Sequence, residues 1–338
     1  QAGTSKSLRY LRYRRYQYKY YGTNLLPAAG TAGRCCAMSV PCCSTRVTMV
    51  RALALAFFVW PARAGVIVWE DGSGGRHEHG AAVSYEAFCE GLLEAVERGT
   101  RPLTLVETPV FAEAWAEARR KRLRPRGRAY TSMRLFEYLM RHETPPQDGL
   151  WLEFGVFRGD SIRIAAEARA AGALVYGFDT FEGLPTAWAE GHQSMDKGAF
   201  SLQGRLPSGL PRNVRLIQGL FEDTLPGFLN AHGERASYIN IDNDLYAGAK
   251  FVLDALGPRL AEGAVLNFHE LVNIVGENVR SSKGAVIPPA RECLQETRAI
   301  YEFLVGQPNL RLELIPRRIL HGQAIAFRVV AQRRHEAE

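Results

Sequence analysis

Short apolar runs rich in β-branched and aromatic residues alternate with amphipathic runs through the second half of the chain. The apolar runs are Leu150–Val156, Ala173–Phe178, Val214–Gln218, Tyr238–Ile241 and Ala264–Phe268, and the amphipathic runs are Ser161–Ala171, Phe221–Ala231 and Ala247–Ala261. Strands that alternate with helices form a parallel sheet with helices on both faces. The pattern therefore predicts an α/β fold of the Rossmann-like kind, in which ligands bind outside the carboxyl ends of the strands.

Further elements are predicted on both sides of this region. Apolar residues at helical spacing predict helices at Ser84–Arg98, Phe111–Leu123, Tyr130–Arg141 and Pro289–Gly306. The first three precede the sheet and are expected to form an accessory cap or interface arm, which gives a weak indication of a homo-oligomer. The runs Arg311–Ile315 and Ala324–Val330 are expected to form an antiparallel hairpin at one edge of the sheet.

Charge is distributed unevenly along the chain. It has 338 residues, of which 46% are apolar and 23% charged, as is typical of a globular protein. Residues 1–64 hold ten of the 42 Lys and Arg residues and no Asp or Glu, which leaves 32 basic and 35 acidic residues in the remainder. Because a nucleic-acid interface needs basic residues clustered on a folded surface, the mildly acidic body predicts no nucleic-acid partner.

The basic leader contains a segment with the features of a targeting signal. Met49-Val50-Arg51 supplies a start and a positive charge, Ala52–Trp60 is continuously apolar, and Ala62-Arg63-Ala64 has the small-x-small pattern of a cleavage site. This apolar run is too short to cross a bilayer, so no stable membrane span is expected. We interpret residues 49–64 as a signal for the secretory pathway or an organelle. A fortuitous apolar strand or helix, in a protein that stays in the cytoplasm, is the alternative.

These segments predict the organisation of the chain. Residues 1–48 are expected to be a disordered basic leader or translated non-coding sequence, and contact of its Tyr, Arg and Lys residues with RNA is the alternative. This leader is followed by the signal at 49–64, an accessory helical region at 65–128, the α/β domain at 129–332 and a tail at 333–338.

Cysteine usage gives little information about the body of the chain. Four of the six cysteines precede Met49, and only Cys89 and Cys293 follow it. Two thiols can form one disulfide, but the spacing gives no reason to expect a disulfide scaffold.

The first predicted strand ends in a glycine-containing turn. Glu153, Gly155 and Gly159 form the pattern E-x-G-x-x-x-G, and Ser161 follows. Glycine lets the backbone turn tightly and approach a ligand without an intervening Cβ. Because the spacing is not G-x-G-x-x-G, the dinucleotide-binding pattern is not met. A purely structural glycine turn is the alternative interpretation.

The second predicted strand ends in Asp179, 24 residues beyond Gly155. A carboxylate in this place can accept hydrogen bonds from both hydroxyls of a ribose. Glu153 would repel phosphates, whereas a cationic sulfonium suits a turn that carries a carboxylate. The pair therefore predicts a nucleoside ligand and favours S-adenosyl-L-methionine over NAD.

Acidic residues and a histidine end the fourth and fifth predicted strands. Asp242 and Asp244 leave the fourth strand on the same side, and His269 and Glu270 end the fifth, which the topology places beside it. One Asp can bind a cation while the other accepts a proton. Asp242 and Glu270 can then share a divalent cation, with His269 either as a third ligand or as a proton acceptor. Capping of the next helix by the two Asp residues is the structural alternative.

Five motifs occur in order along this part of the chain. They are Glu153–Ser161, Phe178–Pro185, Lys197–Phe200, Gly219–Pro226 and Ile241–Tyr246. Together they resemble the macrocin-type O-methyltransferases, which are class I S-adenosylmethionine-dependent enzymes acting on hydroxyls of natural-product sugars and phenols. The similarity extends from about Tyr130 to Val330.

The resemblance implies a seven-stranded methyltransferase sheet at 129–332 and a small-molecule hydroxyl acceptor. It implies cofactor contacts from Glu153, Gly155, Gly159, Ser161 and Asp179, a position near adenine for Gly219 and Phe221, metal ligation by Asp242 and a base at Asp244. Trp188, His192 and Phe200 lie in a long segment that is expected to form a lid or acceptor wall.

One departure from the family pattern concerns the metal. Family members place two consecutive Asp residues where this chain has His269-Glu270. Mg²⁺ prefers oxygen ligands, so a His ligand weakens the Mg²⁺ site or favours a softer divalent cation. Two other functions stay open: a catalytically impaired protein of this fold with a binding role, and a nucleotide-sugar glycosyltransferase that uses Asp242 and Asp244 as its metal-binding pair.

Overall fold

The structure is a computed structural model that describes residues 64–102, 132–190, 193–277, 286, 288–318 and 324–332. The chain divides into two compact units, Gln1–Trp60 and Pro61–Glu338, and all described residues belong to the second. The expected leader, the expected signal up to Arg63, the expected helix Phe111–Leu123 and His192 lie outside the described residues.

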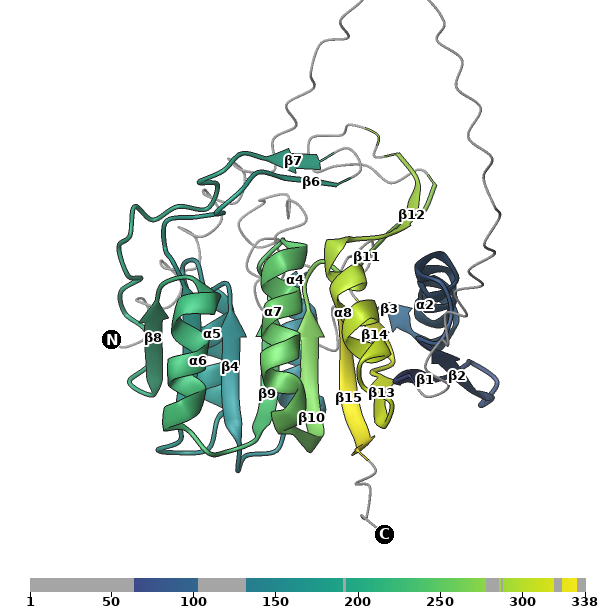
Figure 1. The fold of residues 1–338 in the computed structure, drawn as a ribbon, viewed down its shortest axis with the longest axis horizontal. Coiled ribbons are helices and arrows are strands. Elements are labelled where there is room, and N and C mark those ends of the chain that lie inside the picture. Colours follow the sequence, from purple (N-terminus) through teal and green to yellow (C-terminus); the bar gives the residue numbers. More distant parts are fainter. Residues whose placement is uncertain are drawn as a thin grey trace, which may run out of the picture. The chain divides into compact units, whose positions relative to one another are not determined.

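A nine-stranded mixed sheet forms the centre of the second unit, in the order β2-β1-β13-β15-β10-β9-β4-β5-β8 (Figure 1). Its strands are β1 Val66–Glu70, β2 Arg76–Gly80, β4 Leu150–Phe154, β5 Val175–Asp179, β8 Val214–Gln218, β9 Ala236–Ile241, β10 Leu260–Phe268, β13 Leu310–Leu314 and β15 Ile325–Gln332. The five strands from β8 to β10 run parallel, and β15 is antiparallel to both of its neighbours. This is the Rossmann-like α/β architecture that the alternating pattern predicts.

The strand order reverses between β4 and β9. From β4 the chain moves outward to β5 and β8, and it returns to form β9 on the other side of β4. In open α/β sheets, ligands bind in the crevice that such a reversal leaves at the carboxyl ends of the strands. The turn that follows β4 and the loop that follows β9 flank this place.

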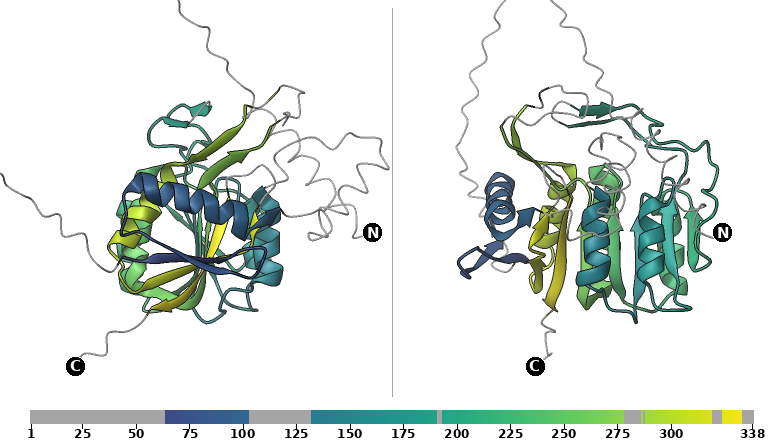
Figure 2. Two further views of the ribbon diagram at one scale, coloured as in Figure 1. Left: turned by 90° about the vertical axis from the view of Figure 1, so that its right-hand side faces the viewer. Right: turned by 180° about the vertical axis from the view of Figure 1, so that it is seen from behind.

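Helices cover both faces of the sheet (Figure 2). On one face α2 Tyr85–Gly99, α6 Phe221–Ala231, α7 Tyr246–Leu256 and α8 Gln295–Val305 share a hydrophobic core, and on the other face lie α4 Ser132–His142 and α5 Asp160–Ala168. Alternate residues of β4 divide between the two cores, with Leu152 and Phe154 on the first and Trp151 on the second. A strand buried on both faces is expected to be mostly apolar, and in β4 Glu153 is the one polar residue.

Within the part of the chain that the structure describes, three small two-stranded sheets accompany the large one. β6 Trp188–Glu190 pairs with β7 Gln193–Met195, β11 Val272–Val275 with β12 Ala290–Cys293, and β3 Arg101–Pro102 with β14 Arg317–Arg318. The pairs β6–β7 and β11–β12 lie beyond the carboxyl ends of the parallel strands (Figure 1). None of the helices within the described ranges combines the length and apolar character needed to cross a membrane.

The sheet differs from the prediction near the chain's amino-terminal region. Seven strands and accessory helices at 65–128 were expected, but that region begins with β1 and β2, which extend the sheet to nine strands. The hairpin of β13 and β15 is therefore not at the edge, because β1 pairs in parallel with β13. The pairing joins Val66 to Arg311, and such a distant contact leaves no local signal. The edge strand β2 is polar and partly exposed, so it lacks an apolar pattern.

The predicted helix Pro289–Gly306 also begins later than expected. Residues Ala290–Cys293 form β12, which pairs antiparallel with β11, and α8 begins at Gln295. The tertiary pairing with β11 overrides the local helical pattern in this segment.

A disulfide joins Cys89 of α2 to Cys293 of β12, with the two Cα atoms 6.0 Å apart. Arg291, on the same strand, donates hydrogen bonds to the carboxylates of Glu90 and Glu97 on α2. The cysteines are 204 residues apart and meet only in the folded chain, which is why their spacing predicted no pairing. Disulfides of this kind persist in oxidising compartments.

We predict that loss of this disulfide lowers the free energy of unfolding by about 2–4 kcal/mol, because the cross-link restricts the unfolded chain. Thermal unfolding with and without dithiothreitol measures the effect, since the reductant lowers the Tm of the wild-type protein and leaves that of Cys89→Ser unchanged. Recovery of Cys89 and Cys293 as separately alkylated thiols from the unreduced protein would contradict the pairing.

Candidate functional site

The turn after β4 approaches the loop after β9 very closely. Gly155 has a φ of +89°, and a Cβ added to it would lie 1.8 Å from the carbonyl oxygen of Asp242. The Asp242 amide donates to the carbonyl oxygen of Phe154 over 2.9 Å. Only glycine permits this backbone conformation together with this contact. The glycine of the E-x-G pattern is therefore required to place Asp242 beside β4.

Gly159 ends the turn at the start of α5 and also has a positive φ, +78°. Two residues later the Ser161 hydroxyl points back toward β4 and donates to Oε1 of Glu153 over 2.7 Å. Glu153 is 0% exposed and Ser161 is buried. The structure thus places two of the expected cofactor residues in the interior beneath the turn, where they bind each other.

A row of buried polar side chains crosses three neighbouring strands beneath the turn. Glu153 on β4, Asn240 on β9 and Asn267 on β10 are partners in the strand register. Nδ2 of Asn267 donates to Oδ1 of Asn240 over 2.7 Å. Burial raises the pKa of Glu153 well above its ordinary value, and hydrogen bonds from Ser161 and Asn240 oppose that rise. The sequence analysis missed both Asn residues, because single amides within apolar strands form no recognisable pattern.

Asp179 ends β5 and holds the turn from the side. Its Oδ2 accepts the backbone N–H groups of Val156 and Phe157 over 2.9 and 2.7 Å, and its Oδ1 accepts that of Phe181 over 2.7 Å. A carboxylate has about four acceptor positions. The partly exposed Asp179 therefore retains acceptor capacity for a hydroxyl of a ligand.

The loop after β8 lies beside Asp179. The Gly219 amide donates to the carbonyl oxygen of Asp179 over 3.1 Å. The Phe221 ring packs edge-on against Phe154, with the ring centroids 5.3 Å apart. Leu220, between them, is 43% exposed and is an apolar residue that the sequence analysis did not single out.

Two of the three aromatic residues expected in a lid or acceptor wall are described. The Phe200 ring contacts that of Phe157 in the glycine turn, with centroids 5.8 Å apart. Trp188 on β6 is buried. Phe200 therefore lies next to the turn, whereas Trp188 is paired with Met195 of β7 in the small β6–β7 sheet.

The loop after β9 is sharply bent. The Leu245 amide donates to the carbonyl oxygen of Asn243 over 2.7 Å, and Asp244 between them has a φ of +62°. A three-residue turn with a positive φ at its centre is rare and strained for a residue other than glycine. The N-cap residue of α7 is Leu245, and no side chain caps it. Helix capping therefore does not account for Asp242 and Asp244.

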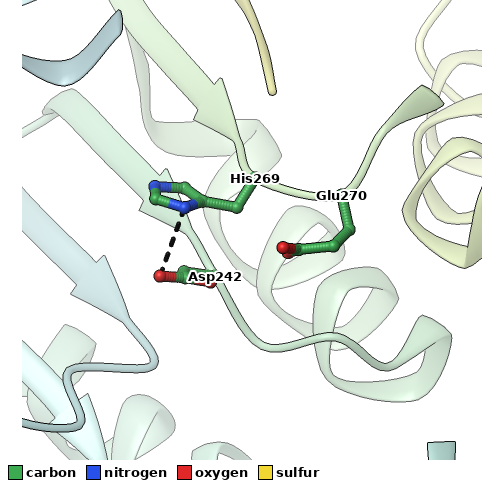
Figure 3. Close-up of side chains that lie close together, drawn as sticks. All are labelled: Asp242, His269 and Glu270. Carbon is green, nitrogen blue, oxygen red and sulfur yellow. Dashed lines mark ion pairs between the residues drawn. The ribbon is translucent and has the colours of Figure 1, made fainter. Parts of the chain in front are cut away.

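Asp242, His269 and Glu270 converge at the ends of β9 and β10 (Figure 3). One ligand atom from each of these side chains lies within 4.8 Å of the others. Nδ1 of His269 is 3.3 Å from Oδ2 of Asp242, and both Asp242 and Glu270 are partly exposed. The parallel pairing of β9 with β10 brings together the three residues that the sequence analysis expected to share a cation.

Burial dominates the electrostatics of this cluster. It lowers the pKa of His269 to about 4, so the imidazole is neutral near pH 7 and can offer a lone pair. Burial, followed by repulsion from Asp179, raises the pKa of Asp242 above its ordinary value. Burial and the Asp242 carboxylate do the same for Asp244. A positive ligand would relieve this repulsion and favour the charged carboxylates.

The donor set fits a divalent cation. It combines two carboxylates with a buried neutral imidazole whose Nε2 has no hydrogen-bond partner among the described residues. Imidazole together with carboxylate suits Mn²⁺, Fe²⁺, Co²⁺ or Zn²⁺, whereas Mg²⁺ prefers oxygen ligands alone. The set therefore differs from an all-oxygen magnesium site.

Glu296, in the first turn of α8, is a further carboxylate at this edge. It is 0% exposed, and its Oε2 accepts the backbone N–H of Glu270 over 3.1 Å. Burial raises its pKa, and the nearby Asp242 and Asp244 add to the rise. The sequence analysis missed Glu296, because acidic residues are common in the first turn of ordinary helices.

Comparison with known proteins adds one match to a protein family. Residues 152–271 match the family model described as a methyltransferase domain. This segment runs from β4 to the residue after Glu270 and contains every site residue that the sequence analysis selected. No protein of curated function matches the chain.

Several solved structures are similar to this chain at low sequence identity. The calicheamicin methyltransferase CalS11 is 19% identical, with coverage of 75% of this chain and 94% of that chain and a TM-score of 0.40. The O-methyltransferase NovP is 18% identical, with coverage of 58% and 78% and a TM-score of 0.38. An O-methyltransferase from Bacillus cereus in complex with S-adenosylhomocysteine is 17% identical, with coverage of 65% and 90% and a TM-score of 0.39.

We predict that Gly155→Ala disrupts this site, because its methyl group would collide with the Asp242 carbonyl oxygen. Gly172→Ala is the matched control: Gly172 has a similar φ of +83°, but a Cβ there meets nothing within 4 Å. Conformational strain alone destabilises the control by about 1–2 kcal/mol. Gly155→Ala should lower the Tm further and abolish binding of S-adenosylhomocysteine in calorimetry. Equal behaviour of the two variants would show that the contact is unimportant.

Proposed function

We propose that the protein is an S-adenosylmethionine-dependent O-methyltransferase that acts on a hydroxyl group of a small molecule such as a sugar, a glycoside or a phenol. One observation carries the proposal. The glycine turn, Asp179 and the Asp242–Asp244 loop meet at the reversal of strand order, within the segment that matches the methyltransferase domain.

The surroundings of the turn support a nucleoside ligand. Asp179 lies beside the turn with acceptor capacity for ribose hydroxyls, and the exposed Leu220 next to it offers an apolar contact for a base. Gly155 and Gly159 leave the backbone of the turn accessible without a Cβ. Carboxylates on neighbouring strand ends favour a cationic ligand over a phosphate. S-adenosylmethionine, when bound here, supplies an electrophilic methyl group on a sulfonium.

Asp244 is the proposed general base. Its bent loop holds the carboxylate beside the reversal point, and its raised pKa suits proton acceptance near neutral pH. When the acceptor oxygen takes the methyl group and S-adenosylhomocysteine is released, the hydroxyl proton would pass to a carboxylate oxygen of Asp244. The fold contributes by holding acceptor and cofactor in line, without a covalent enzyme intermediate.

Asp242, His269 and Glu270 are the residues that would hold a divalent cation. A cation bound there lowers the pKa of a hydroxyl group that it contacts. The neutral His269 and the partly exposed carboxylates of Asp242 and Glu270 are arranged for this role without any change in the strand register. The partial exposure of both carboxylates leaves room for an acceptor oxygen.

We predict that Asp244→Asn lowers kcat by about 10²- to 10⁴-fold, the usual contribution of a positioned base. Affinity for S-adenosylhomocysteine should stay within a factor of about two, because the substitution removes no charge from the turn or from Asp179. Asp254→Asn, on the exposed side of α7, is the matched control and should leave both quantities unchanged.

Labelled methyl transfer to a panel of glycosides and phenols, together with calorimetric titration, measures these effects. Parallel loss of kcat and cofactor affinity in Asp244→Asn would refute the base assignment. Binding of uridine diphosphate, with no binding of S-adenosylhomocysteine, would refute the methyltransferase proposal in favour of a glycosyltransferase.

We also predict that exhaustive treatment with a chelator lowers turnover and that added Mn²⁺ restores it. In Asp242→Asn the restoration should need a higher Mn²⁺ concentration, because one of the three expected ligands is weakened. Full activity of the wild-type protein after verified metal removal would dismiss the role of the cation.

A further inference from the structure

The start of α8 contacts both of the loops that carry the acidic site. The side-chain oxygen of Gln295 accepts the backbone N–H of Tyr246, just beyond Asp244, over 3.2 Å. Oε2 of Glu296 accepts the backbone N–H of Glu270 over 3.1 Å. The first turn of this helix therefore contacts the loop after β9 and the loop after β10 at once.

Glu296 makes the central contact of this arrangement. Besides the N–H of Glu270, the backbone N–H of Asn243 stabilises its carboxylate. Asn243 lies between Asp242 and Asp244, and Glu270 follows His269. Glu296 thus hydrogen-bonds the loop after β10, and its neighbour Gln295 hydrogen-bonds the end of the loop after β9.

Burial of the Glu296 carboxylate at this place is unfavourable for folding. Its side chain is 0% exposed, it lies close to Asp242 and Asp244, and its Oε1 has no hydrogen-bond partner among the described residues. A buried carboxylate beside like charges destabilises a fold, and an apolar residue of similar size is often better tolerated at such a place. Packing of α8 therefore does not explain why a carboxylate is present.

We propose that Glu296 is the positioning residue of the cation site: its buried carboxylate fixes the loop after β10 beside the loop after β9, which Gln295 holds, so that Asp242, His269 and Glu270 present their ligand atoms to a single divalent cation. The inference rests on the proposed function, because it assumes that the three residues bind a cation. It assigns to α8, outside the segment that matches the methyltransferase domain, a direct part in building the site.

Mn²⁺ alone is the probe, and free Mn²⁺ is measured by electron paramagnetic resonance on the full-length protein. Loss of a group that orients metal ligands typically weakens affinity about 10- to 100-fold. Glu296→Ala should therefore raise the Kd for Mn²⁺ by this factor. Glu296→Gln keeps the size and one acceptor oxygen, so its Kd should lie between those of the wild-type protein and Glu296→Ala.

Ile300→Ala is the matched control. Ile300 lies one helical turn beyond Glu296 on α8 and is also 0% exposed, but it belongs to the hydrophobic core and binds neither loop. Its truncation should lower the Tm, while the Kd for Mn²⁺ stays within a factor of about two of the wild-type value.

Three outcomes would overturn the inference. They are unchanged Mn²⁺ affinity in Glu296→Ala, an equal loss of affinity in Ile300→Ala, and no binding of Mn²⁺ by the wild-type protein. Calorimetric titration with S-adenosylhomocysteine on the same samples separates this failure from failure of the proposed function. Binding of that compound without any Mn²⁺ site would refute the role of Glu296 and leave the methyltransferase proposal standing.

Discussion

The contact between the backbone at Gly155 and the carbonyl of Asp242 is the constraint on which the site depends. Around this contact the hydrogen bonds of the parallel sheet continue one residue beyond the ends of the strands. The amides of Gly155, Asp242 and His269 donate to the carbonyl oxygens of Phe178, Phe154 and Ile241, respectively. The first residues after three neighbouring strands are thereby fixed side by side. A single backbone arrangement sets both the turn beside Asp179 and the acidic loop, which explains why a side chain at Gly155 is not tolerated.

The carboxyl-end edge of the sheet carries an excess of negative charge. Asp242, Asp244, Glu270 and Glu296 lie at the ends of adjacent elements, with Glu153 buried beneath them. Burial raises the pKa of Asp242, Asp244, Glu153 and Glu296, and repulsion from nearby carboxylates, Asp179 included, adds to the rise. Both ligands proposed for the site, a sulfonium and a divalent cation, are positive. Their binding would therefore relieve a repulsion that the fold maintains through buried hydrogen bonds and parallel strand pairing. The neutral His269 adds no further negative charge to this set.

Local sequence patterns predict the strands and helices around the site better than the features that depend on contacts between distant residues. The bounds of β8 and α6 agree with the prediction, and the Rossmann-like fold class is confirmed, because alternating periodicity and glycine turns are properties of short segments. β1, the Cys89–Cys293 pair and Glu296 were missed because each depends on a partner far away in the sequence. The strained φ of Asp244 has no sequence signal either, since it results from how α7 starts after β9.

The amino-terminal hairpin and α2 are connected to the acidic site through a short series of contacts. The disulfide and the hydrogen bonds of Arg291 fasten β12 to α2, and Glu296 follows Cys293 by only three residues. The position of the Glu296 carboxylate is thus set from one side by α2 and from the other by its hydrogen bond to the loop after β10. The segment that matches a methyltransferase domain contains the proposed reacting groups, but the contacts that hold them in place extend to α2 and α8. The proposed functional unit is for this reason larger than the segment that the family model matches.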